Sequence, residues 1–180
     1  NIALVVLSSV PLGLDTLTNP NISTSTKMRI FELPWINHDE MGEVYSAVDA
    51  VLSPSLYLDP FPTINLEAMA HGLPVISTIY GGSKEVVIDR KTGYLVDPEN
   101  VQCFAKRILD IHRDPVASKR MGMMGREYYE SRFTSEMFAR KYLVKYSEIC
   151  YNRKNDSVKS QTRSGSLCQR VISFLKFGSL

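Results

Sequence analysis

The chain has 180 residues, and its 44% hydrophobic and 22% charged content is that of an ordinary folded domain, which excludes disorder throughout. Residues 1–150 carry 15 Lys and Arg against 18 Asp and Glu, so the body of the chain has no basic surplus that would indicate nucleic-acid binding. No apolar run reaches the roughly 18 residues of a membrane-spanning helix.

Short apolar runs predict five strands. From the second strand onward, a helical pattern lies between each strand and the next. The strands fall at 2–7, 28–33, 50–53, 74–77 and 93–96, and the helices at about 39–48, 63–71, 84–88 and 100–113. This alternation predicts the α/β class, with a parallel sheet and right-handed crossovers. Residues 8–27 are predicted to be irregular, because they contain two prolines and show no helical period. They are either a disordered insertion or a lost crossover helix.

The end of the chain has a different character. Two further helices, at about 115–130 and 134–150, should pack across the outside of the sheet and complete a domain over residues 1–150. Residues 151–180, with 6 Lys and Arg against 1 acidic residue, are predicted to form a flexible basic tail. A short amphipathic stretch near its end is open to two interpretations, a peripheral membrane contact or a frayed terminus.

Three widely spaced cysteines favour a reducing cytoplasm.

The segment from Pro54 to Val75 carries most of the functional information. It follows the predicted strand 50–53, and open α/β sheets bind their ligands at the carboxyl ends of such strands. Pro62 suits the first turn of the next helix, which would leave the backbone N–H groups of Thr63 and Ile64 unpaired. A helix start of this kind attracts a diphosphate through these donors and the helix dipole.

Two carboxylates flank this helix start. Asp59 precedes the helix and Glu67 lies in its second turn, and carboxylates are natural acceptors for paired sugar hydroxyl groups. Two acids separated by seven residues are a weak pattern when taken alone. Downstream, Gly81 and Gly82 permit a positive φ and a close approach of backbone to ligand, although a plain turn explains this pair equally well.

The three histidines show no sign of nucleophilic or metal chemistry. None of His38, His71 and His112 pairs in sequence with a candidate nucleophile, and no His, Asp and Glu cluster has metal-ligand spacing. His71 is expected to close a helix before Gly72. No metal and no cofactor are therefore expected.

Taken in order, the motifs resemble those of a known family. The runs P-S-x-x-x-D-P-F-P-x-x-x-L-E-A-M-A-x-G-x-P-V-I-S, G-G-x-x-E-V-V and T-G-Y-L-V look like the carboxy-terminal, donor-binding domain of family-4 retaining glycosyltransferases, the "glycosyl transferases group 1" type. The resemblance covers roughly residues 28–150. It implies one half of a GT-B architecture, in which two Rossmann-like domains, each a parallel sheet with helices on both faces, meet across a cleft.

The resemblance also implies roles for individual residues. Asp59 would contact the donor sugar as the catalytic residue, at a position that is usually Glu in the family, and Glu67 would hold the ribose. The backbone amides around Phe61, Thr63 and Ile64 would bind the phosphates and the sugar. The nucleobase would be bordered by Leu33, Pro34 and Trp35, and the cleft would be lined by Gly81 and Gly82. Trp35 either flanks the base or is a half-buried structural residue.

The implied function is transfer of a hexosyl group from a nucleoside diphosphate sugar to an acceptor hydroxyl, with retention of configuration and without a metal, in polysaccharide or glycolipid biosynthesis. The family's amino-terminal acceptor domain is absent from this sequence, as is the first strand of the donor domain with its basic residues. The fragment alone is therefore expected to be inactive. Two alternatives stay open: a GT-B sugar-nucleotide epimerase, and a non-catalytic remnant or partner subunit that binds nucleotide weakly. The donor base, the sugar and the acceptor are not identified.

Overall fold

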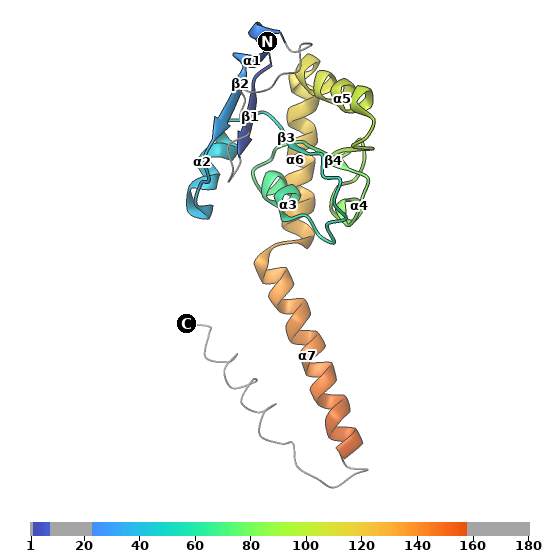
Figure 1. Ribbon diagram of the computed structural model, residues 1–180. Helices are drawn as coiled ribbons and strands as arrows, with labels where there is room; N and C mark the ends of the chain where they lie inside the picture. Colours follow the sequence, from blue (N-terminus) through green and yellow to red (C-terminus); the bar gives the residue numbers. More distant parts are fainter. Residues whose placement is uncertain (1, 8–22, 158–180) are drawn as a thin grey trace. The chain divides into compact units, whose positions relative to one another are not determined.

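The computed structural model describes residues 2–7 and 23–157, in two units that divide between Ser131 and Arg132 (Figure 1). Most of the segment predicted to be irregular, residues 8–22, lies outside the described residues, and so does the basic tail from residue 158 onward. The expected domain at 1–150 and tail at 151–180 stay predictions.

All five predicted strands are present in the first unit, and the pairings between them are parallel. They are β1 (Leu4–Leu7), β2 (Ile30–Leu33), β3 (Val51–Ser53), β4 (Val75–Thr78) and β5 (Gly93–Val96). β1 pairs with β2 in one sheet, and β3, β4 and β5 follow one another in a second sheet. In the second sheet, Val75 of the central strand lies opposite Val51 on one side and Gly93 on the other.

The strands thus form two sheets where the sequence pattern predicted one. Neither β1 nor β3 pairs with a further strand on its outer edge among the described residues. In the doubly wound order 3-2-1-4-5-6, β2 and β1 correspond to strands 3 and 2, and β3, β4 and β5 to strands 4, 5 and 6. Strand 1 of that order would join the two sheets. The resemblance expects this strand to lie outside the sequence, and that expectation stays a prediction.

The helices of the first unit follow the predicted pattern. They are α1 (Thr24–Lys27), the 3₁₀ helix η2 (His38–Glu40), α2 (Met41–Ser46), α3 (Thr63–Ala70), α4 (Ser83–Val86), α5 (Val101–Arg113) and α6 (Pro115–Arg132). α1 corrects the prediction that all of 8–27 is irregular. Ser23 caps this helix by accepting a hydrogen bond from the Thr26 N–H at 3.2 Å. A single turn is too short to produce a helical period in the sequence.

The hydrophobic core lies on both faces of β4, whose four residues are all buried. Val75 packs in a cluster that includes Met69 of α3 and Val86 of α4. Ile76 belongs to a second cluster, which includes Ile111 of α5. Because successive strand residues point to opposite faces, helices cover this sheet on both sides. The predicted α/β class with helices on both faces of a parallel sheet is confirmed.

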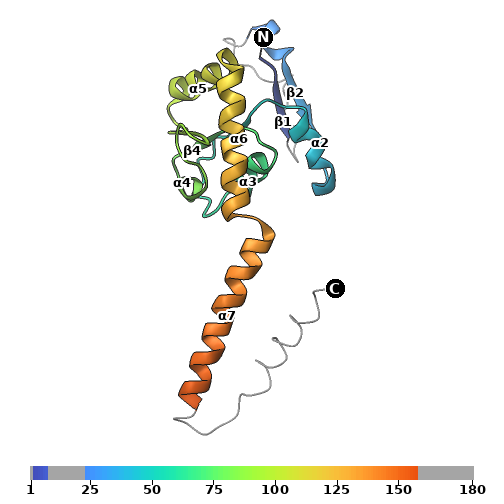
Figure 2. The ribbon, with the colours of Figure 1, turned by 180° about the vertical axis from the view of Figure 1, so that it is seen from behind.

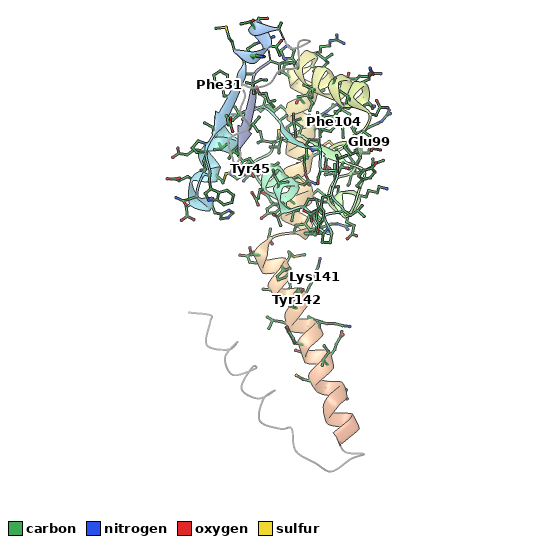
Figure 3. All side chains as sticks on the ribbon, viewed as in Figure 1. Phe31, Tyr45, Glu99, Phe104, Lys141 and Tyr142 are labelled. Carbon is green, nitrogen blue, oxygen red and sulfur yellow. The ribbon has the colours of Figure 1, made fainter. Side chains whose placement is uncertain are left out.

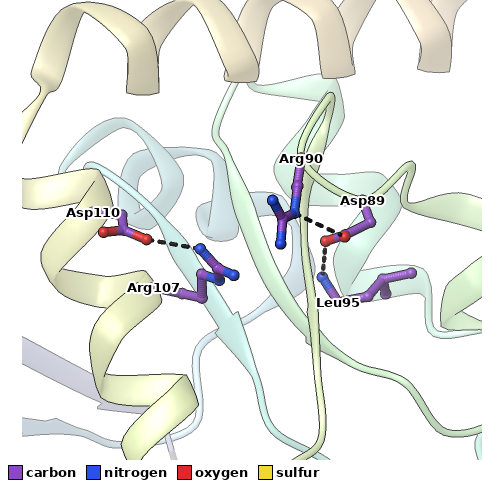
Figure 4. Close-up of polar contacts among 5 residues, drawn as sticks. All are labelled: Asp89, Arg90, Leu95, Arg107 and Asp110. Atoms are coloured by element: carbon purple, nitrogen blue, oxygen red, sulfur yellow. Dashed lines mark hydrogen bonds and ion pairs between the residues drawn. The ribbon is translucent and has the colours of Figure 1, made fainter.

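The turn that leads into β5 is held by Asp89 (Figure 4). Its Oδ1 accepts a hydrogen bond from the Leu95 N–H at 2.9 Å, and its Oδ2 lies 3.6 Å from Arg90 Nε. On the neighbouring helix α5, Arg107 Nη1 pairs with Asp110 Oδ2 at 2.9 Å. The hydrogen bond to Leu95 helps to fix β5, which is the edge strand of the three-stranded sheet on the side away from β3, whereas the Arg107–Asp110 pair lies within α5.

Helix α6 packs closely against the turn between α3 and β4 (Figures 1 and 2). A Cβ atom at Gly122 would collide with the carbonyl group of Gly72, whereas a Cβ atom at Gly125 would lie 3.4 Å from Met69 Cγ. Gly72 itself has a φ of 71°, in the left-handed region that favours glycine. Glycine at position 122 therefore sets how closely α6 approaches the core.

We expect Gly122→Ala to lower the free energy of unfolding by about 1–3 kcal/mol, because the new methyl group meets backbone that cannot rotate away. Gly125→Ala is the matched control, since both substitutions give alanine the same advantage in helix propensity of up to about 1 kcal/mol. Urea unfolding of both variants measures the difference. Equal stability of the two variants would contradict this account of the helix contact.

The second unit contains helix α7 (Ser135–Ser157), which begins where the sequence predicted its last helix and continues past residue 150. Three aromatic side chains of this helix form a row of rings. The ring centroids of Phe138 and Tyr142 lie 4.4 Å apart, and those of Tyr142 and Tyr146 lie 6.2 Å apart. These side chains are exposed. Figure 3 labels Tyr142 on this helix. In the described ranges, no helix is both long and apolar enough to cross a membrane.

Candidate functional site

The loop between β3 and α3 is organised around Asp59. The Asp59 N–H donates to the Tyr57 carbonyl at 2.9 Å, and Asp59 Oδ1 accepts from the Phe61 N–H at 2.9 Å. An aspartate that accepts from the residue two positions ahead forms an Asx turn. The Phe61 amide, which the resemblance assigns to the donor, thus has an acceptor inside the loop. Asp59 Oδ2 makes no hydrogen bond within the part of the chain that the structure describes.

The backbone of Gly81 and Gly82 lies directly against this loop. The Gly82 N–H donates to the Asp59 carbonyl at 2.8 Å. A Cβ atom at Gly81 would collide with the Asp59 carbonyl, and one at Gly82 would collide with the Pro60 carbonyl. Gly81 also has a φ of 60°. The structure therefore brings together two predicted parts of the site and shows that the glycines are required by contact between two loops of this chain.

Helix α3 begins at Thr63. The sequence predicted Pro62 in the first turn of this helix, but Pro62 is the N-cap residue, one position before it. No side chain caps this helix end. Thr63 and Ile64 are exposed. The N–H groups of the first turn of an α-helix have no acceptor within the helix. An uncapped helix start with exposed first residues thus directly follows the Asp59 loop.

Glu67 of α3 is bound by a tyrosine from α2. The Tyr45 hydroxyl donates to Glu67 Oε2 at 2.7 Å, and Tyr45 is only 5% exposed. Burial of the ring, with the hydrogen bond to Glu67 and its charge, raises the pKa of Tyr45 well above its usual range. The sequence analysis missed this partner, because the contact joins residues 22 positions apart.

His71 closes α3, as predicted, and joins the same group of side chains. It is the C-cap residue of the helix, and its Nδ1 lies 2.8 Å from the carbonyl oxygen of Glu67. Its ring stacks on that of Tyr45, with 4.8 Å between the centroids. Tyr45 is therefore held both by its hydroxyl and by its ring.

A buried chain of polar side chains connects α3, β4 and α4. Asn65 Nδ2 donates to Ser77 Oγ at 3.0 Å, and Ser77 Oγ donates to Ser83 Oγ at 3.1 Å. All three residues are buried, and Asn65 Oδ1 has no partner among the described residues. These hydrogen-bonded side chains tie the helix that carries Glu67 to the helix that follows Gly82. A polar residue on the buried face of a helix was the only signal for these hydrogen bonds in the sequence.

Leu33, Pro34 and Trp35, the predicted border of the nucleobase, belong to the other sheet. Leu33 ends β2, and the two residues that follow are exposed. Trp35 is 76% exposed, so the interpretation of this residue as a half-buried structural tryptophan is wrong. The indole has too few neighbours for burial, because it stands in a loop after the carboxyl end of an edge strand. Its predicted role beside a base stays a prediction.

Metal ligands do not converge in the described ranges 2–7 and 23–157, where no group of three or more His, Cys, Asp or Glu side chains could hold an ion. The expectation of a metal-free site stays a prediction. The anion-binding features of the described site are backbone N–H groups and the positive end of the α3 dipole.

Comparison with known proteins identifies the family. Residues 15–128 match the family model described as glycosyl transferases group 1. The chain belongs to this family. Spore coat protein SA of Bacillus subtilis is 30% identical over 117 residues, which make up 64% of this chain and 31% of that protein.

Two solved structures of this fold are informative. Sucrose-phosphate synthase from Thermosynechococcus elongatus is 32% identical, with a TM-score of 0.67 over 71% of this chain and 32% of that one. HepE of Anabaena, solved in complex with UDP-glucose, is 22% identical, with a TM-score of 0.64 over 69% of this chain and 34% of that one. The chain thus spans about a third of the length of these three proteins. The resemblance inferred from the motifs and the GT-B fold are confirmed.

Proposed function

We propose that the protein to which these residues belong is a retaining glycosyltransferase, and that the described site binds its nucleoside diphosphate sugar donor. One observation carries the proposal: an uncapped helix start lies between two carboxylates, Asp59 and Glu67, both held by hydrogen bonds. The solved complex of HepE with UDP-glucose supports a nucleotide sugar as the ligand class.

The diphosphate would bind at the start of α3. The N–H groups of Thr63 and Ile64 lie in the first helical turn, where donors have no acceptor within the helix. Each such contact contributes on the order of 0.3–1 kcal/mol when exposed, because the positive end of the helix dipole favours the anion. These donors would also stabilise the negative charge that develops on the departing diphosphate, without a metal.

The two carboxylates would divide the sugars of the donor between them. Glu67 would accept hydrogen bonds from ribose hydroxyl groups, because a carboxylate suits a pair of O–H donors. Asp59 would use Oδ1 to keep its loop closed and Oδ2 to contact the transferred sugar. Trp35 would flank the nucleobase, with Leu33 and Pro34, from the end of β2.

The transferred hexosyl group would pass to an acceptor hydroxyl bound by a further domain outside these 180 residues, since the chain spans about a third of its relatives. In this arrangement the glycines 81 and 82 set the position of the Asp59 loop. The sugar leaves with its configuration retained, and the present residues supply the donor half of the site.

Calorimetric titration with UDP-, GDP- and ADP-sugars tests the proposal. Saturable binding of one nucleotide class is the expected result, and it would identify the base. Absence of binding to all three would favour the alternative of a non-catalytic remnant or partner subunit. Conversion of a nucleotide sugar to its epimer, without transfer, would favour the epimerase.

We expect Asp59→Asn to lose the discrimination between a nucleoside diphosphate sugar and the bare nucleoside diphosphate. Asparagine keeps an Oδ1 that accepts from the Phe61 N–H, so the loop stays closed while the charge facing the sugar is lost. The affinity for the sugar-bearing form should fall about 10-fold. Titration of both ligands measures this, and an equal loss for both would place the effect in the loop instead.

A further inference from the structure

The two carboxylate oxygens of Glu67 differ in their hydrogen bonding. Oε2 accepts a hydrogen bond from the Tyr45 hydroxyl at 2.7 Å. Tyr45 is the only group that an observed hydrogen bond joins to this carboxylate in the described part of the chain. Glu67 is half-buried, so its side chain is neither free in solvent nor enclosed by the core. Oε1 is therefore the oxygen that remains for a ligand.

Tyr45 is itself fixed in place (Figure 3). It lies in the main core cluster with Met69 and Val51, and only 5% of its surface is exposed. Its ring stacks on His71, whose Nδ1 contacts the backbone carbonyl of Glu67. A tyrosine hydroxyl is ordinarily protonated at neutral pH, and burial and the neighbouring carboxylate raise the pKa of Tyr45 further, so this hydroxyl remains a donor.

A carboxylate with one oxygen bound to a rigid donor cannot rotate freely. Its second oxygen then has a defined direction before the ligand arrives, which reduces the entropy lost on binding. A purely structural role for the same hydrogen bond would be to tie α2 to α3. The two roles differ in one respect: only orientation of Oε1 makes the preference for the ribose hydroxyl groups depend on the Tyr45 hydroxyl.

We propose that Tyr45 is a positioning residue that orients Glu67 so that Oε1 accepts hydrogen bonds from the ribose of the nucleotide donor. This inference rests on the proposed function. Tyr45 does not touch the donor, and it acts through the carboxylate of Glu67. The consequence is a preference for nucleotides with an intact ribose diol that depends on the Tyr45 hydroxyl.

The test measures the affinity of the full-length protein for UDP, GDP and ADP, and for the dideoxy counterpart of each, which lacks both ribose hydroxyls. The variant is Tyr45→Phe, which removes the hydrogen bond but keeps the ring and its stacking on His71. Tyr129→Phe is the matched control, because Tyr129 packs against the same core cluster and makes no hydrogen bond through its hydroxyl within the described ranges. Glu67→Ala, alone and with Tyr45→Phe, completes a double-mutant cycle.

The wild-type protein should prefer the ribose form of its nucleotide by about 10-fold or more, as expected when a charged acceptor loses its donors. Tyr45→Phe should remove most of this preference and leave the affinity for the dideoxy form unchanged. Tyr129→Phe should keep the preference. In the Glu67→Ala background, the additional Tyr45→Phe substitution should have no further effect on it.

Equal weakening of both nucleotide forms by Tyr45→Phe, or no weakening of either, would overturn the inference and leave a structural tie between α2 and α3. The ratio of the two affinities is measured on the same folded protein, so a lower melting temperature does not change its meaning. If the wild-type protein binds no nucleotide, the proposed function fails, and the inference fails with it. If the protein binds nucleotide but Glu67→Ala keeps the ribose preference, Glu67 is not the ribose acceptor, and the inference fails while nucleotide binding stands.

Discussion

Replacing Gly82 with alanine is expected to lower the free energy of unfolding by on the order of 3 kcal/mol and to abolish nucleotide binding. The added methyl group would meet the carbonyl of Pro60, which is backbone and cannot turn aside. Separation of the two backbone segments would also break the 2.8 Å hydrogen bond from the Gly82 N–H to the Asp59 carbonyl. The loop that carries Asp59 would have to move away from the start of α3.

Gly42→Ala is the matched control for this prediction. Gly42 lies in α2, and a Cβ atom there would be 3.8 Å from His71 Nε2, an ordinary contact. Alanine in a helix is favoured over glycine by about 0.5–1 kcal/mol, so this variant should be as stable as the wild type or more so. Denaturant unfolding and nucleotide titration of both variants check the prediction. Wild-type affinity in Gly82→Ala would show that the loop position does not matter for binding.

The second large effect is expected for Glu67→Gln, which should weaken nucleotide binding about 10- to 100-fold. Glutamine keeps a side-chain oxygen that can accept from the Tyr45 hydroxyl, so the contact between α2 and α3 is preserved. The charge that would face the ribose is lost, and neutral acceptors form hydrogen bonds roughly half as strong. The stability of the fold should therefore change little, and the affinity should change much.

Glu43→Gln controls for the loss of one negative charge, because Glu43 is exposed on α2. It should leave both stability and affinity unchanged. Calorimetry with the nucleotide class found for the wild type gives the affinities, and thermal unfolding gives the stabilities. A wild-type affinity in Glu67→Gln would exclude Glu67 from the donor site.

The local motifs were readable because each depends on residues close in sequence. The apolar run at 74–77 corresponds to β4 (Val75–Thr78), and the run at 93–96 to β5, since a short buried strand is marked by its own side chains. The acids at 59 and 67 were recognised from the ordered motifs around them and from their place after a strand, because their spacing alone is a weak pattern. The one-turn helix α1 was missed, because four residues show no period.

The contacts that hold the site together join residues that are distant in sequence. No sequence pattern predicted these contacts. The sequence permitted either a close approach to ligand or a plain turn at Gly81 and Gly82, and only the structure shows the Asp59 loop against them. The sequence left open whether Trp35 flanks a base or is half-buried, and the structure shows it 76% exposed, because burial depends on which elements surround a loop.

The sequence by itself determined the alternation of strands and helices, the family, and the helix start flanked by Asp59 and Glu67. These follow from local periodicity, turn residues and short motifs, which are properties of neighbouring residues. Only the tertiary structure decided that Tyr45 binds Glu67 and that Gly82 holds the loop of Asp59. Such contacts arise when crossover helices bring distant segments together on one sheet, and the free energy of that packing depends on the whole fold rather than on any single segment.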